Sequence, residues 1–151
     1  MSKYGFDIIN GEEVPQLVIT ENYEIIGKHL GTVHVEKGTL FIKGELSGTL
    51  VIYEGASVVI NTGGKQSGTV SVYEGATIQI KGKLSGTSTI HSGAEIIIEE
   101  NAEMTGTTTN NGLIIIRGVF SGATSGNGEF RVEGNGYIKE PIIRDGVYYY
   151  V

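Results

Sequence analysis

The chain contains no cysteine and no tryptophan, and it has only two prolines in 151 residues. Without cysteine, it can form neither disulfides nor thiolate metal sites. No apolar run is long enough to span a membrane, and the N-terminal sequence MSKYGFDIING lacks the apolar core of a signal peptide. We therefore expect a cytoplasmic protein with no membrane partner.

Clustered basic residues are also missing, and the net charge is −6. A negative chain is repelled by the phosphate backbone, so we expect no nucleic-acid partner. The three histidines, His29, His34 and His91, are scattered through the repeat, and the sequence contains no P-loop, GxSxG or HExxH motif. The sequence predicts a protein that is not an enzyme and uses no metal or cofactor.

What the chain does have is a repeat that begins with Gly-Thr. This dipeptide stands at residues 31, 48, 68, 86 and 106 and becomes Gly-Ala at 122, with spacings of 17, 20, 18, 20 and 16 residues. Within each repeat, short segments alternate apolar and polar residues, as strands with one buried face do. A period of about 18 residues built from such strands is typical of a β-solenoid, in which every repeat is one turn of the chain.

The repeat predicts an all-β, single-domain, triangular β-helix with about six or seven coils. The alternating apolar residues should face inward and stack from coil to coil, as in the series Leu40/Ile42, Val58/Ile60, Ile78/Ile80, Ile96/Ile98 and Ile114/Ile116. Glycines recur at the expected corners because glycine tolerates positive φ and close backbone approach. We favour a right-handed coil, since two sides carry an apolar pair and the coil lengths vary.

Both terminal segments depart from the repeat. We therefore expect a solenoid over residues 17–138, with an N-terminal cap at 1–16 and a C-terminal cap at 139–151. Pro15 and Pro141 interrupt pairing in a strand ladder, and Asp145-Gly146 favours a turn. Such caps would cover the strand edges that every open solenoid leaves unpaired.

One outward-facing column of the repeat is unexpectedly apolar. Strict alternation predicts that five stacked residues face solvent, namely Phe41, Val59, Gln79, Ile97 and Ile115. Four large apolar residues on one exposed face are unusual, so we expect either a terminal segment or a protein partner to cover them. The neighbouring outward column contains charged residues of both signs that could frame an interface: Lys43, Lys81, Glu99 and Arg117.

Three other outward features suggest further functions. An insertion at Glu99, Glu100 and Glu103 forms an acidic bulge, which suits an acidic inhibitor or immunity-type protein that neutralises a basic toxin. Rows of threonine, such as 87–89 and 107–109, are similar to those of ice-binding solenoids. Glu54 and Glu74 should stack at a corner, but they would have no pocket walls there, so a carbohydrate-binding or pectin-degrading solenoid remains a minor alternative.

The phrases GTVHVEKGTLFIKGELSGTLVIYEG and GTVSVYEGATIQIKGKLSGT resemble bactofilins, a family of bacterial polymer-forming cytoskeletal proteins. The resemblance covers about residues 27–122. It implies a right-handed triangular β-helix that acts through protein–protein contacts and assembles with copies of itself. The uneven coils and the absence of proline-rich tails depart from the family pattern. Whether the partner is another protein or a second copy, and whether the chain is a monomer or an oligomer, stays open.

Overall fold

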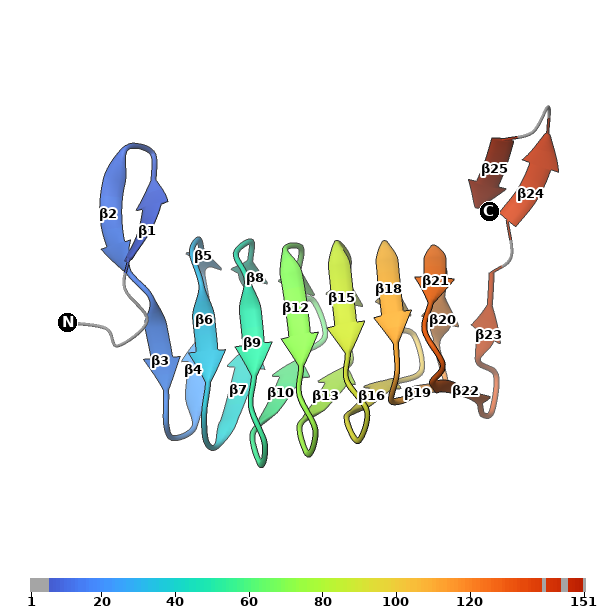
Figure 1. Ribbon diagram of the computed structural model, residues 1–151, viewed down its shortest axis with the longest axis horizontal. Helices are drawn as coiled ribbons and strands as arrows, with labels where there is room; N and C mark the ends of the chain where they lie inside the picture. Colours follow the sequence, from blue (N-terminus) through green and yellow to red (C-terminus); the bar gives the residue numbers. More distant parts are fainter. Residues whose placement is uncertain (1–5, 140, 145–146, 151) are drawn as a thin grey trace.

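The computed structural model describes residues 6–139, 141–144 and 147–150 as an all-β protein. Its centre is a solenoid of three seven-stranded parallel sheets, which form the three sides of a rod (Figure 1). The chain visits the sides in turn, so strands that follow one another in sequence belong to different sheets, and each strand pairs with strands one turn away. The predicted β-solenoid with about 18 residues per coil is confirmed.

The three sides differ in strand length. Side one contains β3 (Leu17–Ile19), β6 (Val33–Val35), β9 (Leu50–Ile52), β12 (Thr69–Val72), β15 (Thr87–Ile90), β18 (Thr107–Asn110) and β21 (Ala123–Ser125). Side two contains β4 (Tyr23–Ile25), β7 (Thr39–Ile42), β10 (Ser57–Ile60), β13 (Thr77–Ile80), β16 (Glu95–Ile98), β19 (Leu113–Ile116) and β22 (Glu129–Val132). Side three contains β5 (Lys28–His29), β8 (Glu45–Leu46), β11 (Lys65–Gln66), β14 (Lys83–Leu84), β17 (Glu103–Met104), β20 (Val119–Phe120) and β23 (Tyr137–Ile138).

The core is the stack of inward residues from all three sides. Ile78 pairs with Val58 on one side and Ile96 on the other, and all three side chains are fully buried. The same register continues along the rod, so every inward residue packs on its equivalents in the neighbouring coils. Burial of these aliphatic side chains provides the main stabilisation, since each fully buried one contributes about 1.5–3 kcal/mol.

The interior is not entirely aliphatic, which the sequence pattern did not predict. Ser88, Thr108 and Asn110 occupy inward positions on side one, and Gln66 does so on side three. Asn110 is satisfied because its Nδ2 donates to the Glu129 carbonyl and its Oδ1 accepts from the Gly112 N–H. By contrast, Ser88 Oγ and Thr108 Oγ1 are buried and have no hydrogen-bond partner among the described residues.

The Gly-Thr glycines form a stacked column of their own at one corner. At Gly86, with φ of 96°, an added Cβ would lie 2.3 Å from the Gly68 carbonyl oxygen. Gly48, Gly68 and Gly106 meet the glycine of the preceding coil in the same way. The repeat therefore keeps glycine because successive coils approach too closely at this corner for any side chain.

Two antiparallel hairpins lie at the ends of the solenoid (Figure 1). The N-terminal hairpin joins β1 (Phe6–Ile9) to β2 (Glu12–Pro15), and the C-terminal one joins β24 (Pro141–Arg144) to β25 (Val147–Tyr150). In the strand pairings of the described chain, each hairpin pairs only within itself and adds no strand to the three sides. The turn expected at residues 145–146 lies outside the described residues.

Candidate interaction surfaces

The apolar column predicted from the sequence lies on the outer face of side two. The parallel register places Phe41, Val59, Gln79, Ile97 and Ile115 directly above one another. Ile115 is only 8% exposed, and the other four are half-buried, because the stacked side chains shield one another. The same column begins at Glu24 on β4 and ends at Arg131 on β22. An apolar strip is therefore bounded by one negative and one positive residue.

The N-terminal hairpin is attached to a different part of the rod. The Asp7 carboxylate accepts hydrogen bonds from the Thr32 N–H, the Thr32 hydroxyl and the Gln16 side-chain amide. Gln16 Oε1 also lies 2.7 Å from Nε2 of His34 on side one. These contacts hold the hairpin beside the first coils of side one and not over the apolar column.

The charged column beside the apolar one forms ion pairs between coils. Lys43 Nζ lies 2.7 Å from Glu24, and Arg117 contacts Glu99 at 3.0 Å and Glu133 at 3.1 Å. The Gln79 amide also donates to Glu99, and this hydrogen bond, assisted by Arg117, lowers the pKa of the Glu99 carboxyl. In return, the hydrogen bonds with Glu99 and Glu133 raise the pKa of Arg117. Gln79 thus links the two columns.

Removing the Gln79 amide should change how stability depends on pH. Because the pKa of Glu99 is lowered in the folded state, the stabilisation it gives is present above the ordinary carboxyl pKa of about 4.3 and is lost as the pH falls through the lower folded value. We expect Gln79→Met to lower the free energy of unfolding at pH 7 by less than about 1 kcal/mol, and this loss to shrink between about pH 5 and pH 3.

This prediction is checked by urea unfolding of both proteins across that pH range. Gln79→Met is compared with wild type, and the same comparison is made in a Glu99→Gln background, where the difference should not vary with pH. A loss in the Gln79→Met protein that stays constant from pH 7 to pH 3 would show that Gln79 acts only through packing.

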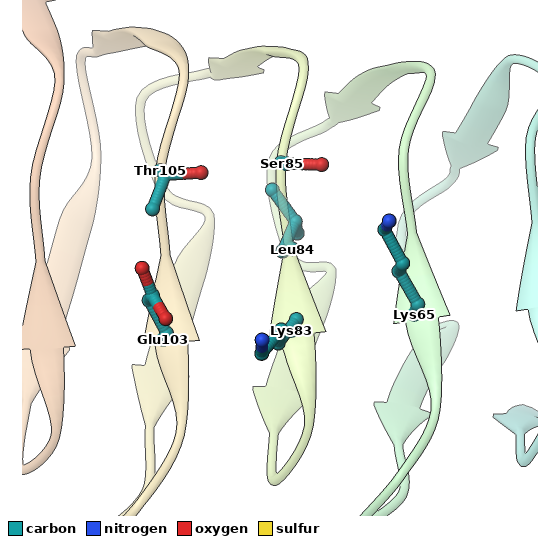
Figure 2. Close-up of a pocket in the computed structure, with 6 residues that line it drawn as sticks. All are labelled: Lys65, Lys83, Leu84, Ser85, Glu103 and Thr105. Carbon is teal, nitrogen blue, oxygen red and sulfur yellow. The ribbon is translucent and has the colours of Figure 1, made fainter.

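The acidic bulge is only partly available to a partner. Glu99 is already engaged by Gln79 and Arg117, whereas Glu100 is exposed. Glu103 is half-buried on side three, in register with Lys83. Figure 2 shows Lys65, Lys83 and Glu103 on neighbouring coils, where they line a shallow hollow of about 200 Å³ with Leu84, Ser85 and Thr105. The charges around this hollow are mixed, so it does not favour ligands of either sign.

The corner after side one carries a stack of four aromatic rings. His34, Tyr53, Tyr73 and His91 have ring centroids 5.9, 5.6 and 4.6 Å apart, with successive rings tilted by no more than 18°. Tyr53, Tyr73 and His91 each follow directly after a strand of side one, whereas His34 lies within strand β6 itself. His34 joins through its ring, and its Nδ1 lies 2.9 Å from the Tyr53 hydroxyl. The ring faces are used within the stack, so mainly ring edges face solvent.

The predicted threonine rows are in register on side one. Thr69, Thr87 and Thr107 stack, as do Ser71, Thr89 and Thr109. The second row is interrupted at Val51, which is paired with His34 and Ser71. The regular array thus covers only the middle coils.

Comparison with protein-family models, curated proteins and solved structures finds no match to this chain. Within the described residues, no three His, Cys, Asp or Glu side chains are grouped so that they could hold a metal ion. The described chain also has no helix of the length and apolarity needed to cross a membrane.

The apolar column can be tested by a charge on its outer face. We expect Ile97→Lys to leave the fold intact, because the side chain points away from the core, and to abolish any lateral association that uses this column. Analytical ultracentrifugation compares this variant with Thr89→Lys, which places the same charge on the outer face of side one. Unchanged oligomeric state and solubility in both variants would exclude the column as an interface.

Proposed function

We propose that this protein is a non-catalytic structural β-solenoid that associates with copies of itself through the two ends of the rod. The observation that carries the proposal is the distribution of exposed apolar residues. Among the described residues, the exposed large apolar side chains are Ile8, Tyr23, Ile26, Leu30, Tyr73, Val132, Tyr137 and Ile138. All but Tyr73 lie in the terminal coils or in the N-terminal hairpin.

Two of these side chains, Val132 and Ile138, are exposed only because they belong to the last coil and no further coil covers them. Val132 follows Ile116 in an inward column, yet Val132 is 48% exposed and Ile116 is fully buried. Ile138 is 39% exposed, although Phe120 beneath it is 1% exposed. One further coil of the same kind would bury both residues. A second copy supplies such a coil.

The backbone at the ends supports the same conclusion. The edge strands β4 and β22 each have one paired neighbour on side two, and the hairpins pair with neither of them. An exposed edge strand presents free N–H and C=O groups, which are a template for another strand. Among the described strands, both ends of the solenoid therefore present an unpaired edge. At the C-terminal end the inward Val132 and Ile138 are also exposed, whereas at the N-terminal end Tyr23 is 45% exposed and Ile19 and Ile25 are buried.

The test is sedimentation and negative-stain electron microscopy of the purified protein at micromolar concentration. We expect pelleting assemblies with the width of the solenoid. The N–H groups of Glu129 and Glu133 donate hydrogen bonds to the carbonyls of Gly112 and Ile116 in the preceding coil. Because backbone N–H groups alternate in direction along a strand, the N–H of Val132 points the other way, toward the free edge. Val132→Pro should therefore block assembly without removing a ladder hydrogen bond. Tyr73→Ser removes an exposed apolar group in the middle of the rod and should assemble normally.

A stable monomer at all accessible concentrations would contradict the proposal. That outcome would favour the second candidate, an acidic protein that binds and blocks a basic partner. The net charge of −6 is consistent with that candidate, but no described contact favours it, since Glu99 in the acidic bulge is already paired. The bactofilin resemblance and the uncovered ends both support self-association.

A further inference from the structure

We infer that the two ends join head to tail, with the C-terminal coil of one copy stacked on the N-terminal coil of the next, so that the assembly is polar. This inference rests on the proposed self-association and adds the direction of the contact. Continuing the ladder of side two past β22 places β4 of the next copy in the following position. The two strands then belong to the same columns, because the register links Glu24 to Arg131 through the intervening coils.

The side chains that meet in this register are complementary. Arg131 stacks on Glu24 of the next copy, Phe130 on Tyr23, and Val132 on Ile25. Within one copy, Arg131 already pairs with Glu129 and Glu24 with Lys43. At the junction, Arg131 would lie between Glu129 of its own copy and Glu24 of the next copy, so that positive and negative side chains alternate. Arg117 lies between Glu99 and Glu133 in the same way inside the rod. Of the inward residues at this junction, Val132 and Tyr23 are 48% and 45% exposed and would become covered, whereas Ile25 is already 6% exposed within its own copy.

Side three gives a second favourable match. The ladder there ends at Tyr137 and Ile138 and begins at Lys28 and His29. Continuation stacks the Tyr137 ring, which is half exposed, on the Lys28 side chain, a cation–aromatic pair that is favourable at a surface. Ile138 covers His29, whose pKa is lowered mainly by burial and which therefore tolerates an apolar neighbour in its neutral form.

The opposite arrangement, head to head, is geometrically poor. A two-fold axis reverses the order of the three sides, so only one side can meet its own equivalent, and the paired strands become antiparallel. If side two meets itself, Glu24 at the centre of the three-residue strand β4 faces Glu24 of the other copy, and like charges directly opposite are destabilising. The three-residue strand β3 would then face the two-residue strand β5. Head-to-tail stacking instead continues all three parallel sides.

Such a contact uses two different surfaces and need not close on itself. A heterologous interface that does not close generates an open filament, in which every subunit points the same way. The two ends of the filament then differ, since one exposes a Glu24 surface and the other an Arg131 surface. Polarity is the property that separates this inference from self-association in general.

The absence of cysteine allows a direct test by engineered disulfides. Residue 26 follows Ile25 and residue 133 follows Val132, so the two share one outward column. In the head-to-tail contact their Cα atoms lie about one strand spacing apart, roughly 4.8 Å, which is within the range that a disulfide spans. We expect an equimolar mixture of Ile26→Cys and Glu133→Cys to form a crosslinked dimer under mild oxidation, while neither variant alone crosslinks.

Each other outcome overturns the inference. A dimer from Ile26→Cys alone shows head-to-head contact, and one from Glu133→Cys alone shows tail-to-tail contact. Assembly that pellets in reductant but gives no crosslink in the mixture also excludes the head-to-tail register. Absence of any assembly in wild type contradicts the proposed function itself, so the two failures are distinguishable.

A charge exchange provides a second test that does not depend on a disulfide. Glu24→Arg and Arg131→Glu each place like charges at the junction, so each should raise the concentration needed for assembly at least several-fold. An equimolar mixture should assemble again, because each variant then meets an opposite charge on the other. If both single variants assemble as wild type does, or if the mixture stays unassembled while both variants remain folded, Arg131 does not meet Glu24.

Discussion

Gly86→Ala is expected to lower the free energy of unfolding by about 4 kcal/mol or more, enough to unfold much of the protein at moderate temperature. The new Cβ would lie 2.3 Å from the Gly68 carbonyl oxygen, a backbone atom that cannot move without shifting the adjoining coil. Positive φ at Gly86 adds a further cost of about 1–2 kcal/mol for any residue with a side chain. The measurement is chemical unfolding followed by circular dichroism.

Gly55→Ala is the matched control for this prediction. Gly55 also has positive φ, at 83°, but a Cβ there would have no neighbour within 4 Å. We expect Gly55→Ala to cost only the conformational strain, about 1–2 kcal/mol. Equal losses in Gly55→Ala and Gly86→Ala would mean that backbone conformation alone, and not the close approach of stacked coils, requires glycine at the Gly-Thr corner.

Ile96→Ala should have the second largest effect, a loss of about 2–5 kcal/mol. Ile96 is fully buried between Ile78 and Ile114, and the coils above and below it hold the space open, so the cavity cannot collapse completely. The neighbouring variant Ile97→Ala removes the same atoms from the outer face of the same strand. Because Ile97 is only half-buried, we expect a loss of about 1 kcal/mol for that variant.

Urea unfolding of the two alanine variants, at a concentration below that at which the protein assembles, checks this prediction. The ratio of the two losses reports which face of β16 is buried. A larger loss for Ile97→Ala than for Ile96→Ala would reverse the alternation and contradict the register of side two.

The interior columns on side two could be predicted from the sequence because a β-strand alternates with a period of two residues and the coil repeats the pattern. That alternation correctly placed Leu40, Ile78 and Ile114 inside and Phe41 and Ile97 outside. The same reasoning missed Ser88 and Thr108, because small polar residues in an inward register look like surface strand residues when read singly. It also could not predict that the His34 ring would join the tyrosine stack.

What the sequence by itself determined is the coil: its period, its three strands, its inward columns and its glycine corners. These features follow from the alternation of apolar and polar residues and from the glycines, which recur in every turn, so that each repeat supports the same interpretation. Only the tertiary structure decided which residues are left uncovered. Val132 and Ile116 are both aliphatic and lie in the same inward column, yet Ile116 is buried and Val132 is half exposed. The difference arises because burial in a stack depends on whether another coil follows.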